Sequence, residues 1–155
     1  MGDKFFVSFN SPQCGWMSIG FAAGAAEFHT TTAHAPHRRA LPELLTILTE
    51  LLDQNSAQNE FTLRWNRDPE EFDFYFSRAG GQATLRIFQY PTEERDGAER
   101  ELMFEFTGDA REIGAAFYAT FAQMERDSRV DEFEFNWRQP FPHREFENFK
   151  IALGV

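Results

Sequence analysis

The chain has 155 residues and a net charge of −10 at pH 7, and 16% of its residues are aromatic, including 19 Phe. That length is typical of one domain, and a chain of this size buries roughly 70% of its unfolded surface, so it can form a core without disulfides. The negative charge argues against direct binding of nucleic acid or of anionic membranes, because both depend on Lys and Arg.

The single cysteine, Cys14, rules out an intramolecular disulfide and fits a reducing compartment. The first residues lack the basic-then-apolar layout of a secretory signal. No apolar run approaches the ~20 residues that a membrane-spanning helix needs. We therefore expect a cytoplasmic protein.

The first third of the chain predicts strands. Apolar alternation over residues 5–9 indicates a strand, and residues 10–15 are rich in turn-forming types. Residues 16–33 predict two strands, or one strand broken by a bend, because their middle is small and contains Gly. A short helix across the Ala-rich middle is the alternative. A basic, Pro-containing linker follows at residues 34–40.

A helix is expected after this linker. Pro42 suits its first turn, where a missing N–H costs nothing, and Asn55 is a plausible stop. Six leucines recur at helical spacing: Leu41, Leu44, Leu45, Leu48, Leu51 and Leu52.

Residues 61–106 predict an antiparallel meander. Aromatic and aliphatic residues alternate with polar ones in several short runs, most clearly at Phe72, Phe74 and Phe76. Turn-forming or charged stretches at 67–69, 79–81 and 91–98 separate the runs. One face of the sheet should therefore be apolar.

The clearest helix start in the chain is at Asp109, which can cap the first free N–H groups while Glu112 reaches back. The apolar stripe behind it consists of Ile113, Phe117, Phe121 and Met124.

The C-terminal region is less regular. Residues 133–137 alternate in a way that favours a strand, with a helical turn as the alternative. A short terminal helix is expected after Pro142 and should end at Gly154. Its apolar face consists of Phe146, Phe149 and Leu153.

Together these elements predict a single α+β domain over residues 1–155. It should contain an antiparallel β-meander sheet of about six to seven strands, packed against two main helices and a short C-terminal helix.

Two patterns invite a hypothesis of catalysis or metal binding. His29, His34 and His37 lie within nine residues, but zinc needs ligands that converge on one point, and we favour solvent-exposed imidazoles. The local sequence around Cys14 resembles that of a papain-like nucleophile, but such a thiol starts a long helix and here a strand is expected. We expect no catalytic residue, no metal and no cofactor.

The acidic residues around the second meander strand could form a carboxylate pair for acid–base catalysis. Such a pair needs two carboxylates in different environments that face one cleft. A water-exposed hairpin rim is the favoured interpretation. The residues concerned are Asp68, Glu70, Glu71 and Asp73.

Trp65 and Trp137 each lie at the boundary of an expected element and are followed closely by Arg. Trp and Arg are common interface anchors, so both tryptophans are candidate partner-binding residues. Such rings also close the edges of ordinary cores.

The acidity is concentrated in residues 93–132, which carry twelve acidic and five basic residues. A solvated face explains this, and so does a docking surface for a basic partner. The candidate partner-binding carboxylates are Glu93, Glu94, Asp96, Glu99, Glu101 and Glu105.

In its order of elements, its acidic surface and its lack of a catalytic motif, the chain resembles the small immunity proteins that bacteria carry against their own contact-delivered or polymorphic toxins. The resemblance covers the overall build and no motif. It implies a cytoplasmic protein that binds a basic toxin domain, often a nuclease, and blocks its active site with complementary charge.

Two other classes of function remain open. One is a small-molecule-binding or enzymatic domain with an aromatic-lined cavity, into which Tyr75, Tyr90 or His29 would point. The other is a homodimeric scaffold that pairs through an exposed sheet edge or a Trp-rich face.

Overall fold

The computed structural model describes residues 3–155, which form seven strands and four α-helices. The strands are β1 (Phe5–Phe9), β2 (Trp16–Ala23), β3 (Ala26–Ala33), β4 (Glu60–Asn66), β5 (Glu71–Ala79), β6 (Gln82–Tyr90) and β7 (Glu101–Asp109). The helices are α1 (Ala40–Leu52), α2 (Ala110–Asp127), α3 (Phe133–Trp137) and α4 (His143–Leu153), with a 3₁₀ turn η1 (Gly97–Glu99) before β7.

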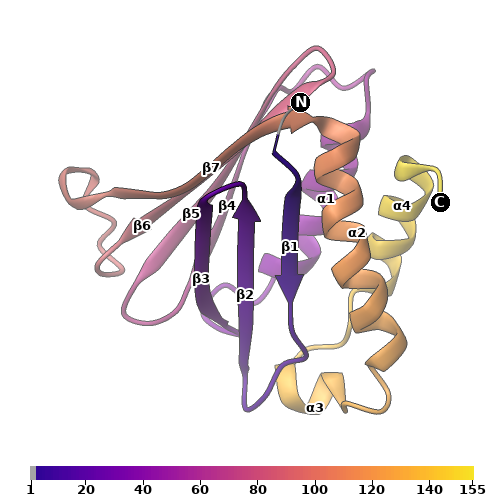
Figure 1. Cartoon of the computed structure of the whole chain (residues 1–155). Coiled ribbons are helices and arrows are strands. Elements are labelled where there is room, and N and C mark those ends of the chain that lie inside the picture. Colours follow the sequence, from indigo (N-terminus) through magenta and orange to yellow (C-terminus); the bar gives the residue numbers. More distant parts are fainter. Residues whose placement is uncertain (1–2) are drawn as a thin grey trace.

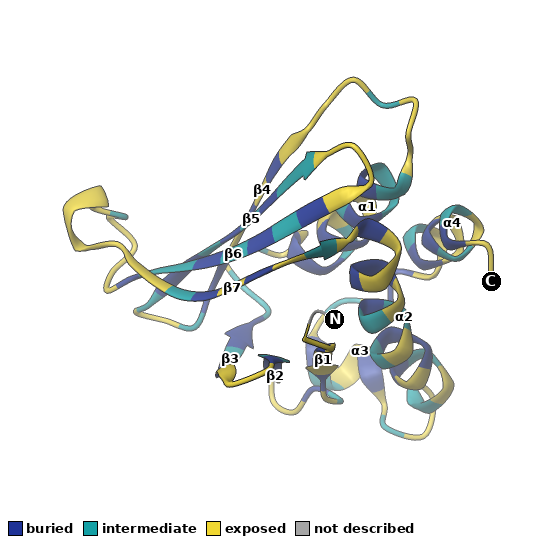
Figure 2. Ribbon diagram, turned by 45° about the horizontal axis from the view of Figure 1, so that its top comes forward, coloured by how far each residue is buried: buried dark blue, intermediate teal, exposed yellow. Residues whose placement is uncertain are grey.

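The strands form two antiparallel sheets, one in the order β1-β2-β3 and one in the order β4-β5-β6-β7. The expected α+β class, the two main helices and the short C-terminal helix are confirmed. The run over residues 16–33 is a hairpin of two strands. The three-stranded sheet and the helices lie on the same side of the four-stranded sheet (Figures 1 and 2).

The register of the four-stranded sheet separates its residues into an inner and an outer face. One inner row runs from β4 to β7 through Phe61, Phe76, Leu85 and Phe106, all of which are buried. An irregularity at Ile87/Phe88 turns Leu102 of β7 to the outer face, opposite Phe88. The outer face is otherwise polar and is not covered by a helix (Figure 1).

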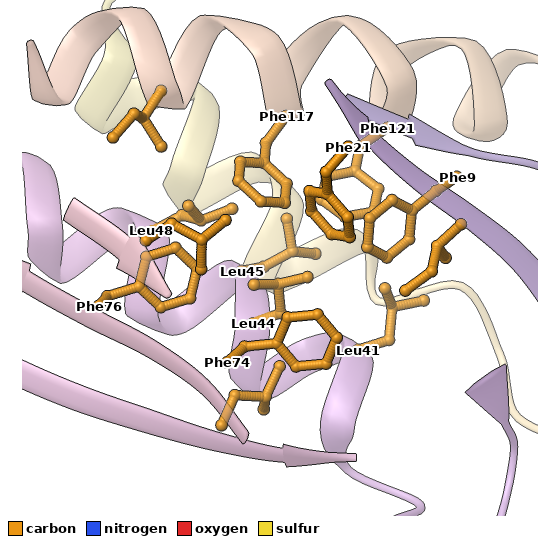
Figure 3. Packing of buried hydrophobic residues seen from close by; sticks show 14 of the residues in the cluster. Phe9, Phe21, Leu41, Leu44, Leu45, Leu48, Phe74, Phe76, Phe117 and Phe121 are labelled. Atoms are coloured by element: carbon orange, nitrogen blue, oxygen red, sulfur yellow. The ribbon is translucent and has the colours of Figure 1, made fainter. Parts of the chain in front are cut away.

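The core lies between the two sheets and α2. The Phe117 ring contacts rings from both sheets, with centroid distances of 6.1 Å to Phe5 and 6.2 Å to Phe9, Phe21 and Phe76. Leucines of α1 fill the remaining space, as Figure 3 shows. The buried side chains of α1 and α2 lie on the apolar faces that the sequence predicted.

Asp109 caps α2 as expected, because its Oδ1 accepts a hydrogen bond of 2.8 Å from the Arg111 N–H. The expected second bond, from the Asp109 N–H to the Glu112 side chain, is not formed. The first helix ends at Leu52, three residues before the expected stop.

The expected strand at residues 133–137 is wrong, because this segment is α3. Phe133 and Trp137, four residues apart, are buried, whereas Phe135 between them is 72% exposed. A strand would have placed all three rings on one face. The Asn136 carbonyl accepts a hydrogen bond of 2.6 Å from the Gly15 N–H, which fixes this short helix against the β1–β2 connection.

We expect Phe117→Ala to destabilise the protein by about 3–5 kcal/mol, because the cavity it leaves lies where both sheets meet α2. The measurement is the free energy of unfolding in urea. Phe135→Ala, at an exposed position, should change it by less than about 0.5 kcal/mol. Equal effects of the two substitutions would contradict a core centred on Phe117.

Candidate functional site

Three connecting segments meet at one end of the four-stranded sheet. They are the β3–α1 linker (34–39), the β4–β5 turn (67–70) and the β6–β7 loop (91–100). The Asn66 side chain joins β4 to the linker through a hydrogen bond of 3.2 Å from Nδ2 to the Ala35 carbonyl. Polar side chains of all three segments therefore lie close together at this end of the sheet.

Arg95 fastens the β6–β7 loop to the outer face of the sheet. Its Nε donates to Glu71 Oε1 at 3.1 Å, and its Nη1 forms an ion pair with Asp73. Nη2 donates to the Phe72 carbonyl at 3.1 Å. The guanidinium also lies 5.3 Å from the centre of the Tyr90 ring. One arginine in the middle of this loop therefore fixes it to the sheet, and the loop carries several acidic residues.

Side chains of β4 and of the α3–α4 connection fix the linker and the end of β3. The carbonyls of Ala33, His34 and Ala35 each accept a side-chain hydrogen bond, of 3.0, 3.2 and 3.2 Å, from Trp65, Gln139 and Asn66. The His37 Nε2 lies 2.9 Å from Glu71 Oε1, so the linker and the β6–β7 loop share one carboxylate. We call Glu71, Asp73, Tyr90, Arg95 and His37 the polar network.

Tyr90 closes the polar network through a hydrogen bond of 2.9 Å from its hydroxyl to Asp73 Oδ2. Burial, and then this bond to a carboxylate, raise the pKa of Tyr90 above its usual value of 10.0. The hydroxyl thus stays protonated and continues to donate to Asp73 in mildly alkaline solution.

The six candidate carboxylates are all exposed, and four of them lie in the projecting β6–β7 loop (Figure 2). We call them the acidic surface: Glu93, Glu94, Asp96, Glu99, Glu101 and Glu105. Glu105 forms an ion pair with Arg86, and the other five form none with residues 3–155. Of the two arginines within this stretch, Arg95 points into the polar network and Arg100 lies 3.9 Å from the centre of the Phe88 ring.

Two cavities lie beside the polar network and share Pro36. One, of about 530 Å³, is lined by four carboxylates, Asp68, Glu71, Glu93 and Glu94. The other, of about 790 Å³, is lined by Arg38, Arg39, Arg64 and His37, together with Glu43 and Asp73. Within residues 3–155 none of these three arginines forms an ion pair. One cavity is therefore lined by carboxylates without a basic side chain, and the other by three arginines and a histidine with two carboxylates.

The structure buries both candidate tryptophans. Trp65 is 0% and Trp137 is 2% exposed, and their ring centres lie 6.2 Å apart. Their assignment as partner-binding residues is therefore wrong. Each ring follows the apolar face of its element into the core, and the Trp65 Nε1–H donates to the carbonyl of Ala33, the last residue of β3.

The three candidate histidines have different surroundings. His29 is exposed on the outer face of the three-stranded sheet beside Glu27, while His34 lies against the Gly15 carbonyl at 3.2 Å. Only His37 joins the polar network. Over residues 3–155, no group of three or more His, Cys, Asp or Glu side chains is arranged to hold a metal ion. Cys14 is exposed, and a strand follows it, as expected.

The expected water-exposed rim is only partly correct. Asp68 is exposed and Glu70 pairs with Arg67, but Glu71 is 5% exposed and Asp73 is half-buried. The sequence pattern places Glu71 and Asp73 on one face of β5. It contains no signal that the loop and the linker would cover them, because Arg95 and His37 come from distant segments.

The three side chains that were expected to point into an internal ligand cavity do not point inward. Tyr75 pairs across strands with Thr62 and Arg86 on the outer face, and its hydroxyl bonds to Glu60. Tyr90 lies in the polar network, and His29 is exposed. The aromatic inner face packs against other rings and leucines instead.

The chain matches no protein-family model, no curated protein and no solved structure. None of the helices in residues 3–155 is long and apolar enough to span a membrane.

We expect Arg95→Ala to destabilise the protein by about 3–5 kcal/mol, because Glu71 and Asp73 would remain largely buried without their cation. Amide hydrogen exchange of residues 91–100 should accelerate in the same variant. The measurements are urea unfolding and exchange followed by mass spectrometry. Arg100→Ala, in the same loop, should cost at most about 1 kcal/mol, and similar exchange in both variants would contradict the anchoring role of Arg95.

A second prediction concerns alkaline pH. Because the pKa of Tyr90 is higher in the folded than in the unfolded protein, its contribution to stability is complete below pH 10 and is lost as pH rises through the folded value. Tyr90→Phe should therefore show a smaller fall in unfolding free energy above pH 10. Urea unfolding at a series of pH values tests this, and parallel curves for the two proteins would refute it.

Proposed function

We propose that this protein is a protein-binding module whose partner is a basic protein that docks on the acidic surface. The observation that carries this proposal is the set of five exposed carboxylates on one anchored loop and the strand after it, which form no ion pair with any of residues 3–155. Carboxylates left unpaired at the surface remain available to Lys and Arg of a partner.

The polar network favours binding because it holds the β6–β7 loop in one position. A loop that is ordered before association loses less conformational entropy when the partner docks. The chain's net charge of −10 adds a long-range attraction that would steer a basic protein toward it and raise the association rate. The same charge disfavours nucleic acid as the ligand.

The specific form of the proposal is an immunity protein that neutralises a basic toxin domain in the cytoplasm. The α+β build and the acidic surface support it, in line with the resemblance noted from the sequence. In this role the protein acts by covering a site on its partner and performs no reaction itself.

The proposal is tested by removing the unpaired charges. One variant carries Glu93→Gln, Glu94→Gln, Asp96→Asn, Glu99→Gln and Glu101→Gln. A control variant loses five exposed carboxylates elsewhere, through Glu27→Gln, Glu43→Gln, Glu132→Gln, Glu134→Gln and Glu147→Gln. Both variants have a net charge of −5, so a difference between them reports position and not total charge.

The unmodified protein and the two variants each serve as bait in a lysate of the cells that naturally produce the protein, at low and at high salt. We expect the unmodified protein and the control to retain one basic protein at low salt, and the first variant to lose it. With that partner, the association rate should fall by roughly 10- to 1,000-fold in the first variant. Equal retention by both variants, or no retained protein at low salt, would refute the proposal.

A further inference from the structure

The acidic cavity beside the polar network has an unusual lining. Its polar side chains are Asn66, Asp68, Glu71, Thr92, Glu93 and Glu94, and no lysine, arginine or histidine lines it. Its volume of about 530 Å³ leaves room for a side chain of a partner. We call it the acceptor cavity.

One buried oxygen in its lining has no hydrogen-bond donor, and one solvent-open carboxylate oxygen beside it has none either. Asn66 is 2% exposed, its Nδ2 donates to the Ala35 carbonyl, and its Oδ1 accepts no bond from residues 3–155. In Glu71, the bonds from His37 and Arg95 both go to Oε1, and Oε2, which is open to solvent, accepts none from residues 3–155. A buried acceptor without a donor costs free energy that a bound donor would recover.

The missing donor must also be cationic, because four carboxylates line the cavity and Asp68, Glu93 and Glu94 have no ion pair with residues 3–155. The lining carboxylates do not converge as metal ligands do. Spread acceptors suit a planar guanidinium, which presents five N–H donors in fixed directions and is more weakly hydrated than an ammonium.

We propose that the acceptor cavity binds an arginine side chain of the partner protein. This inference rests on the proposed function, since Glu93 and Glu94 belong to both the acidic surface and the cavity wall. An arginine projecting from a protein docked on the acidic surface would reach the cavity without crossing the basic one. The unpaired Arg38, Arg39 and Arg64 on the other side of Pro36 repel the same cation and so favour one orientation of the partner.

The cavity can be tested without knowing the partner, by titrating the protein with N-acetyl-arginine amide. We expect saturable shifts in the two-dimensional ¹H–¹⁵N spectrum, centred on the Asn66 side-chain amide and the backbone amides of residues 92–94. For one side chain, a dissociation constant on the order of 1 mM is expected. N-acetyl-citrulline amide, which has the same shape without the charge, should bind at least about 10-fold more weakly, a difference of ~1.4 kcal/mol.

Substitutions then locate the binding. Asp68→Asn, Glu93→Gln and Glu94→Gln combined should weaken N-acetyl-arginine amide by at least about 10-fold, while Glu147→Gln on α4 should leave it unchanged. The same spectra show whether each variant is folded. Equal binding of the arginine and citrulline compounds, equal binding of N-acetyl-lysine amide, or shifts away from the cavity would overturn the proposal.

The outcomes separate this inference from the proposed function. If the arginine compound binds in the cavity but no basic protein is captured, the cavity stands and the proposed function fails. If a captured protein is lost with Glu99→Gln and Glu101→Gln but is unaffected by the cavity substitutions, the proposed function stands and the arginine assignment fails.

Discussion

Phenylalanine rings hold the two sheets together and join both of them to α2. The sheets share no strand, so their relative position depends on rings from β1, β2 and β5 that pack around Phe117 of α2. Each ring buries a large, rigid surface, and that rigidity restricts how the layers can slide. A hydrogen bond also joins α2 to β1, because Thr120 Oγ1 accepts from the Phe9 N–H at 2.8 Å.

Packing the aromatic face inward determines what the outer face presents. Because side chains alternate along a strand, burial of Phe72 and Phe74 places Glu71 and Asp73 on the outer face of β5. The register then aligns Asn66, Glu71 and Tyr90 in one row across β4, β5 and β6. The polar network and the acceptor cavity are therefore built on the reverse side of the hydrophobic core, where no helix competes for the space.

The strands, the two main helices and their buried faces could be predicted because each depends on local periodicity and on end signals such as Asp109. The failure at residues 133–137 has a physical cause, since five residues with apolar types at every second position fit one helical turn as well as a strand. In the structure the segment is helical, and its Asn136 carbonyl accepts a bond from the Gly15 N–H. The acidic loop was visible in composition, whereas its anchor was not, because Arg95 meets Glu71 and Asp73 across more than twenty residues of sequence.

The distribution of charge at this end of the molecule carries more information than the net charge does. A uniformly acidic protein attracts any cation, and such attraction is screened by salt and has little directional preference. Here a cavity lined by carboxylates lies beside one in which arginines outnumber carboxylates, with Pro36 in both walls. A partner whose cation is attracted to the first cavity and repelled by the second must approach in one orientation. Since the loop and the linker are both tied to Glu71, the two cavities keep their relative position, and this fixed geometry turns an electrostatic attraction into a specific one.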